Sequence, residues 1–116
     1  MKNSPALITA ALVAALVLHA SAATAADGSV TITNPADGAT LDAMDENMLT
    51  YEVVPGPRGD HVHVYIDDTE VGILRQLTGS YALPALDAGE REICIRVVNR
   101  AHTPVGVDGC VKIMVQ

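Results

Sequence analysis

The sequence lacks tryptophan and phenylalanine altogether, and its only aromatic side chains of the phenylalanine, tyrosine and tryptophan class are three tyrosines. The apolar residues are therefore mostly valine, isoleucine, leucine and alanine. The β-branched ones come in short runs that end at glycine, proline, asparagine or aspartate. Such runs are typical of β-strands, and no helical periodicity is present from residue 27 onward. The composition therefore favours an all-β fold.

Positively charged residues are also scarce. Seven lysines and arginines stand against fourteen aspartates and glutamates, and one of the seven, Lys2, precedes the expected domain. The remaining six against fourteen give residues 27–116 a net charge near −8. This balance argues against nucleic acid or an anionic membrane as a partner, and it is compatible with solubility and with the attraction of cations.

Groups that support catalysis are few. From residue 27 onward the only serines are Ser29 and Ser80, and neither stands in the Gly-x-Ser-x-Gly pattern of a nucleophile elbow. A glycine-rich phosphate-binding loop is absent from the sequence as well. We therefore expect a domain that binds a ligand and is not an enzyme.

The first 25 residues have the pattern of a signal peptide. Lys2 is positively charged, residues 6–18 form an uncharged apolar run, and Ala23-Thr24-Ala25 supplies the small residues that signal peptidase recognises. The run is shorter than the roughly 20 residues that a membrane-spanning helix requires. We expect cleavage after Ala25, no membrane insertion after cleavage, and a periplasmic or secreted protein.

Residues 27–116 are enough for one domain. Short apolar runs between turn-forming residues predict strands at 30–33, 48–54, 59–67, 71–74, 80–83, 93–98 and 110–115. Strands at this spacing are typical of an antiparallel β-sandwich.

Two segments resemble known sandwich domains. Residues 86–99 contain a leucine, a glycine turn, an alternating strand and an asparagine, and they resemble the E–F turn and F strand of fibronectin type III and related immunoglobulin-like domains. Residues 34–40 are similar to the first strand of bacterial immunoglobulin-like modules. The tryptophan that antibody-type domains carry on strand C is missing. The resemblance implies an immunoglobulin-like β-sandwich of about seven strands.

The chain has two cysteines, Cys94 and Cys110, one on each of the last two expected strands. An even number of cysteines in an exported protein indicates a disulfide. Each cysteine alternates with β-branched residues of its own strand, so both sulfurs are expected on the face away from the core, opposite each other in a hairpin. A bond that closes a loop of this length stabilises the fold by about 3 kcal/mol in the chain-entropy model.

The stretch from Gly59 to Asp67 alternates strictly. Its valines and its isoleucine share one parity, and His61, His63 and Tyr65 share the other. A period of two is typical of a half-buried strand, so both histidines are expected on an exposed face opposite the core. Imidazoles at positions i and i+2 of a strand lie roughly 6–7 Å apart, close enough to bind one ion together.

The immunoglobulin-like resemblance adds a third histidine. Strand C of such a sandwich lies beside strand F, and the B–C and F–G loops share one end. The start of the histidine strand is therefore expected near the F–G loop, residues 99–106, which contains His102. Three neutral imidazoles suit Cu(II) or Zn(II), and Asp60, Tyr65 or water would complete the coordination shell.

Residues 59–67, 86–99 and 99–106 together resemble an uncharacterised family of small exported bacterial domains with a histidine-rich strand and an N-x-H-x-P loop. Residues 59–63 match the first motif, and residues 99–104 match the loop with one extra residue. The L-x-P-G-x-H hairpin of that family departs here, because Ala88 replaces its proline and Glu90-Arg91 replace its histidine. The resemblance implies a domain type and a histidine site, and no reaction.

We therefore predict a non-enzymatic domain that binds a divalent transition metal, copper before zinc, through His61, His63 and His102. Neutral imidazoles would capture the ion, so the affinity should fall as the pH drops through about 6.5. A histidine pair on a strand is also compatible with an ordinary polar face. The alternative is therefore a module that recognises an exported protein or glycan partner without a metal.

Overall fold

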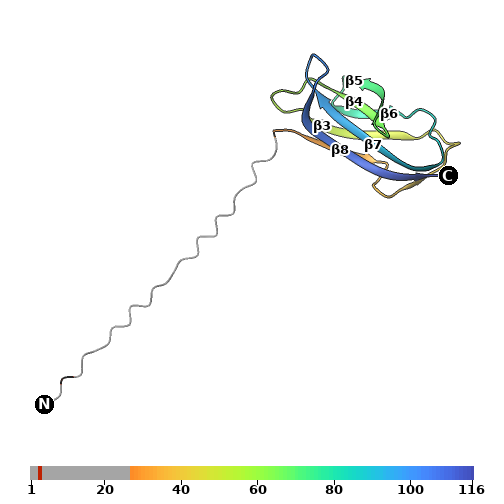
Figure 1. Ribbon diagram of the computed structural model, residues 1–116, viewed down its shortest axis with the longest axis horizontal. Helices are drawn as coiled ribbons and strands as arrows, with labels where there is room; N and C mark the ends of the chain where they lie inside the picture. Colours follow the sequence, from red (N-terminus) through yellow and green to blue (C-terminus); the bar gives the residue numbers. More distant parts are fainter. Residues whose placement is uncertain (1–2, 4–26) are drawn as a thin grey trace.

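The computed structural model of the protein describes Asn3 and residues 27–116 (Figure 1). The expected signal peptide, residues 1–25, lies outside the described residues apart from Asn3, so its cleavage and the location of the protein stay predictions. Across the described residues, no helix has the length and apolar character needed to span a bilayer.

The described residues form two β-sheets that pack on a common core (Figure 1). One sheet has the strand order β1-β3-β6, and the other has the order β2-β8-β7-β4-β5. The strands are β1 (Ser29–Asn34), β2 (Thr40–Leu41), β3 (Met48–Val54), β4 (His61–Ile66), β5 (Thr69–Leu74), β6 (Thr78–Ala82), β7 (Gly89–Val98) and β8 (Pro104–Val115). The predicted all-β sandwich is confirmed.

The strand bounds differ from the predicted ones where polar residues join a long hairpin. Strand β3 has the predicted bounds, whereas β7 begins at Gly89 and β8 at Pro104, several residues before the apolar runs. The two strands pair antiparallel from Gly89 opposite Val115 to Val98 opposite Pro104. Strand β2 is a further difference, because two residues are too few for a periodic signal. It pairs with β8 in parallel, so the sheet is not wholly antiparallel.

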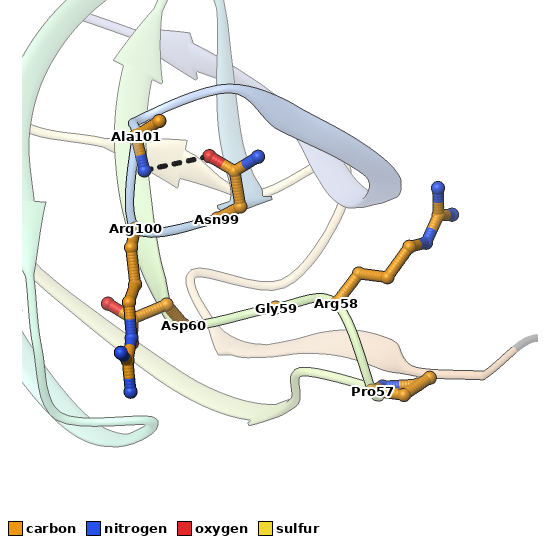
Figure 2. A pocket seen from close by; sticks show the side chains of 7 residues that line it. All are labelled: Pro57, Arg58, Gly59, Asp60, Asn99, Arg100 and Ala101. Carbon is orange, nitrogen blue, oxygen red and sulfur yellow. Dashed lines mark hydrogen bonds and ion pairs between the residues drawn. The ribbon is translucent and has the colours of Figure 1, made fainter.

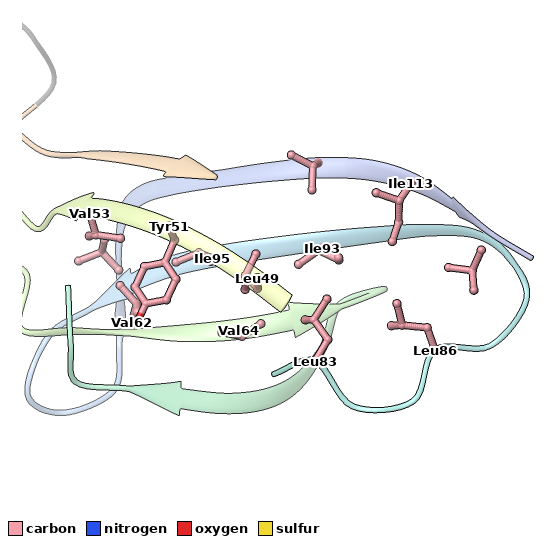
Figure 3. Packing of buried hydrophobic residues seen from close by; sticks show 13 residues of the cluster. Leu49, Tyr51, Val53, Val62, Val64, Leu83, Leu86, Ile93, Ile95 and Ile113 are labelled. Carbon is pink, nitrogen blue, oxygen red and sulfur yellow. The ribbon is translucent and has the colours of Figure 1, made fainter. Parts of the chain in front are cut away.

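The core lies between the sheets and consists mainly of aliphatic side chains (Figure 3). Its buried members are Leu49, Tyr51, Val53, Val62, Val64, Leu83, Leu86, Ile93, Ile95, Val97, Val111, Ile113 and Val115. Tyr51 is the one fully buried aromatic side chain among the three tyrosines, and its hydroxyl donates to the carbonyl oxygen of Gln76 at 2.9 Å. Burial raises the pKa of this hydroxyl, which keeps it a hydrogen-bond donor.

The predicted disulfide joins Cys94 of β7 to Cys110 of β8. The two residues are direct partners in the β7–β8 pairing, with Cα atoms 4.1 Å apart. Both lie on the face away from the core, as the alternation of their strands predicted. The bond therefore fixes the register of the hairpin whose connecting loop carries His102.

Candidate metal centre

Strand β4 lies between β5 and β7 in the larger sheet. Val62 and Val64 point into the core, so His61 and His63 point outward, as predicted. The expectation that this face is exposed is wrong, because the two histidines are only 1% and 5% exposed. Neighbouring polar side chains cover them, so the strand is buried on both faces at this point.

The β7–β8 loop provides much of this cover. His61 pairs with Val98, the last residue of β7, so the loop begins directly beside the first histidine. Inside the loop, the side-chain oxygen of Asn99 accepts a hydrogen bond from the amide of Ala101 at 2.9 Å (Figure 2). It accepts another from the amide of Thr103 at 3.0 Å. His102 adopts the left-handed conformation with φ of 63°, which is uncommon for a residue other than glycine. The loop thereby returns the His102 ring to the sheet.

The three histidines present one ring nitrogen each to a common point. Nε2 of His61 lies 3.2 Å from Nε2 of His63, and Nδ1 of His102 lies 3.1 and 3.0 Å from those two atoms. We call His61, His63 and His102 the histidine cluster. The predicted meeting of a loop histidine with the strand pair is therefore present, although His102 and His63 are 39 residues apart in the sequence.

Carboxylates bind the far nitrogens of both strand histidines. Asp60 Oδ2 lies 2.9 Å from Nδ1 of His61, and Glu70 Oε1 contacts Nδ1 of His63. A carboxylate accepts hydrogen bonds, so each Nδ1 carries the proton and each Nε2 presents a lone pair. Metal-binding histidines typically have this arrangement, which fixes the tautomer and the direction of the ring.

Hydrogen bonds among neutral rings can satisfy the three converging nitrogens only by sharing a single proton. The Nε2 atoms of His61 and His63 are both acceptors in the tautomers that the carboxylates impose. Nδ1 of His102 has one proton at most to share between them. A cation at the meeting point would bind all three lone pairs at once.

The distances between the nitrogens fit a transition metal. Nitrogens about 2.0–2.1 Å from a shared ion are about 2.9 Å apart at a right angle and about 3.4 Å apart at a tetrahedral angle. The observed separations of 3.0 to 3.2 Å fall between these limits. The exposed His102 leaves one side of the cluster open toward solvent.

Two further ligands proposed from the sequence lie elsewhere. Asp60 binds the outer nitrogen of His61, so it orients a ring and does not join the three nitrogens. The ring of Tyr65 has its centroid 6.5 Å from that of His63, and the guanidinium of Arg96 lies 4.3 Å above it. Tyr65 therefore forms a cation–π contact beside the cluster.

The surroundings of the cluster influence its protonation. Burial lowers the pKa of His63, and the nearby Glu70 opposes this effect only in part. The hydrogen bond from His61 lowers the pKa of Asp60, which keeps that carboxylate ionised. A buried neutral imidazole beside an ionised carboxylate is suited to binding a cation.

Sequence reasoning missed Glu70 and Asn99. A signal for Glu70 was available in Asp67-Asp68, two turn-forming residues near the end of the predicted strand 59–67. In the structure both residues have positive φ, of 48° and 65°. A two-residue turn of this kind pairs Glu70 with Tyr65, diagonal to His63, as the structure has it. Asn99 stood in the quoted loop motif, but its hydrogen bonds depend on the conformation of the loop.

A shallow pocket lies beside the cluster, between the β3–β4 and β7–β8 loops (Figure 2). The residues that line it are Pro57, Arg58, Gly59, Asp60, Asn99, Arg100 and Ala101. Arg100 Nε lies 3.6 Å from the Asp60 carboxylate, whereas the Arg58 side chain points away from Asp60 and donates to the carbonyl oxygen of Val105. The pocket wall thus includes the carboxylate that orients His61.

Comparison with known proteins supports the fold. No protein-family model matches the chain, and neither does any curated protein sequence. Among solved structures, the fibronectin(III)-like modules of Clostridium thermocellum CbhA superpose with a TM-score of 0.63 at 18% identity, over 78% of this chain and 47% of that one. An engineered protein superposes with a TM-score of 0.54 at 19% identity, over 77% of this chain and 20% of the other.

The chain thus spans about half the length of the first of these proteins and a fifth of the second. At these identities the likeness concerns the fold alone. It agrees with the predicted fibronectin type III-like and immunoglobulin-like architecture. The resemblance to an uncharacterised exported family stays a prediction.

Proposed function

We propose that this domain binds one divalent transition metal ion, Cu(II) before Zn(II), and that it does so without catalysing a reaction. The ligands are Nε2 of His61, Nε2 of His63 and Nδ1 of His102. The observation that carries the proposal is the convergence of these three nitrogens within 3.2 Å of one another, with carboxylates on the outer nitrogens of the two strand histidines.

The three imidazole nitrogens favour a divalent transition metal ion over calcium or magnesium. Neutral imidazole nitrogens favour copper and zinc, whereas calcium and magnesium take oxygen ligands. For a given set of nitrogen ligands, Cu(II) binds more tightly than Zn(II) in the usual order of divalent ions. Three protein ligands leave at least one position on the ion for water or an outside ligand.

The test is a titration of the purified protein, free of a histidine tag, with Cu(II) and Zn(II) in competition with a chelator of known affinity. We expect one ion per chain. His61→Ala and His63→Ala should each weaken binding at least a hundredfold. His102→Asn should also weaken it, since asparagine tolerates the left-handed conformation and preserves the loop.

Tyr65→Phe is the matched control, because Tyr65 lies on the same face of β4 and is not a ligand in this proposal. It should leave the affinity within about threefold of the wild type, well inside one decade of the equilibrium constant. Absence of stoichiometric binding, or unchanged affinity in both His61→Ala and His63→Ala, would overturn the proposal.

We also propose that the domain functions in the periplasm or outside the cell. The signal-like pattern of residues 1–25 and a disulfide between the only two cysteines both support an oxidising compartment. Mass spectrometry of the protein from fractionated cells provides the test. A mature chain that begins at Ala26 in the exported fraction is expected, and a full-length cytoplasmic chain would contradict export.

A further inference from the structure

We infer that Asp60 and Glu70 are positioning residues that make the histidine cluster selective for a divalent over a monovalent ion. This inference rests on the proposed metal binding and extends it to the charge of the ion. It concerns two side chains that contact the outer nitrogens of the ligands and do not touch the ion.

The two carboxylates reach the cluster from separate elements. Asp60 is the last residue of the β3–β4 loop, and its backbone amide donates to the carbonyl oxygen of Val98 at 2.8 Å. Glu70 lies on β5, opposite Tyr65. Both contacts therefore depend on strand pairing, and each holds one ring from the side away from the converging nitrogens.

The charges of the assembled site balance only with a divalent ion. Three neutral imidazoles and two ionised carboxylates carry a total charge of −2. A divalent ion brings this sum to zero, whereas a monovalent ion leaves one negative charge uncompensated on carboxylates whose side chains are 33% and 45% exposed. Water screens these partly exposed carboxylates in part, so the remaining charge disfavours a monovalent ion, though less than it would in a fully buried site.

Two arginines near Asp60 change this balance little. Arg75 Nη1 and Arg100 Nε lie 3.9 and 3.6 Å from the Asp60 carboxylate, but their side chains are 71% and 93% exposed. Solvent screens such exposed pairs strongly. Among the ion pairs of the described residues, Glu70 contacts only His63.

Coulomb's law predicts how the loss of a carboxylate charge should affect the affinity for ions of different charge. The attraction between a fixed carboxylate and an ion is proportional to the charge of the ion. Removing one carboxylate charge should therefore change the logarithm of the affinity about twice as much for a divalent ion as for a monovalent one. A change that only disturbs ring positions carries no such dependence on the charge of the ion.

The experiment uses Zn(II) and Ag(I) as probes and the variants Asp60→Asn and Glu70→Gln. Each amide keeps an oxygen that accepts the Nδ1–H hydrogen bond while it removes the negative charge. We expect each variant to weaken Zn(II) about 30-fold, within the range for partners of metal-binding histidines. The same variants should weaken Ag(I) about fivefold, so the ratio of the Zn(II) to the Ag(I) affinity falls about sixfold.

Asp68→Asn is the matched control, because Asp68 is an exposed acid in the turn between β4 and β5 that pairs with Arg96 and not with a histidine. It removes the same net charge and should leave both affinities unchanged. His63→Ala establishes that both ions use the cluster, since it should weaken Zn(II) and Ag(I) alike.

Different results would contradict the role of the carboxylates and the proposed metal binding. Equal losses of Zn(II) and Ag(I) in the amide variants, or no loss of either, would overturn the role of the carboxylates while metal binding stands. Absence of histidine-dependent Zn(II) binding in the wild type would overturn the proposed function itself.

Discussion

The backbone amide of His102 donates to the carbonyl oxygen of Asn99 at 2.9 Å, and the Asn99 amide in turn donates to the carbonyl oxygen of Thr103 at the same distance. The Asn99 side chain binds two more amides of the loop. A single asparagine thus holds both ends of the turn that directs the His102 ring toward β4. The direction of the third ligand depends on a residue that is not itself a ligand.

Asn99→Ala should weaken both the fold and the site. Loss of two side-chain hydrogen bonds should lower the free energy of unfolding by about 1–2 kcal/mol. The metal affinity should fall about tenfold, since His102 loses its fixed direction. Urea unfolding and metal titration measure the two effects.

Asn47→Ala is the control for this prediction. The Asn47 side chain also donates to loop carbonyl oxygens, those of Asp42 and Asp45, but it lies between β2 and β3, outside the cluster. It should lower stability and leave the metal affinity unchanged. A loss of affinity in Asn47→Ala equal to that in Asn99→Ala would contradict a local role for Asn99.

Metal binding should stabilise the fold. An ion that binds only the folded state at about 100 times its Kd adds about 2.7 kcal/mol to the free energy of unfolding. For a domain of this size, the midpoint of thermal unfolding should rise by about 10–20 °C. Circular dichroism with Zn(II), and then with excess chelator, measures the rise and its reversal. A similar rise of the unfolding midpoint in His63→Ala would show that the ion stabilises the fold by binding at another site.

The metal affinity should fall in acid. Protons compete with the ion for the same nitrogens, so each ligand contributes fully only while its imidazole is neutral. Burial lowers the pKa of His63 from its ordinary value of 6.5. The His63 ring therefore stays neutral and able to bind the ion at that pH, and it loses this ability as the pH falls further. Titrations with Zn(II) from pH 7.5 to 5 should show this decline. An affinity that does not change over this range would contradict ligation by imidazole.

Asp67 should make the stability of the domain depend on pH. The Glu92 backbone amide and the Arg91 guanidinium both donate to this carboxylate at 3.0 Å, and they lower its pKa below the ordinary 3.8. The unfolded chain therefore binds the proton at a higher pH than the folded one. The contribution of Asp67 is complete above about pH 3.8 and is lost as the pH falls through the lowered value.

Asp67→Asn tests this contribution. Asparagine also tolerates positive φ, so the turn should be retained. The variant should be less stable than the wild type at pH 6, and the difference in the free energy of unfolding should shrink below pH 3.8. Urea unfolding at both pH values provides the measurement, and a difference that is independent of pH would contradict the proposed linkage.

The strict alternation of residues 61–66 was enough to place the histidines on the face opposite Val62 and Val64, because side chains of a strand point alternately to its two sides. The position of His102 near them followed from the resemblance to immunoglobulin-like topology. The first inference depends on the alternation within one strand and the second on the topology of the sheet, and the structure agrees with both of them.

The burial of the histidines could not be predicted in the same way. It depends on the loop hydrogen bonds of Asn99 and on the reach of the Glu70 side chain, neither of which leaves a periodic pattern. The pairing of β4 with β5 also contains an irregularity between Val64 and Tyr65, which sets Ile73 opposite His63. Such β-bulges change which residues share a face, and the alternation of the flanking residues does not reveal them.

Strand β5 is an outer strand of its sheet, and it contributes the carboxylate that orients His63. Its backbone is hydrogen-bonded to a neighbouring strand of that sheet along one side only, so its amides are expected to exchange with deuterium sooner than those of β4 or β7. An ion on His63 would anchor Glu70 and, through it, this outer strand. Slower deuterium uptake in residues 69–74 would then indicate that the metal site is occupied, although β5 supplies no ligand to the ion.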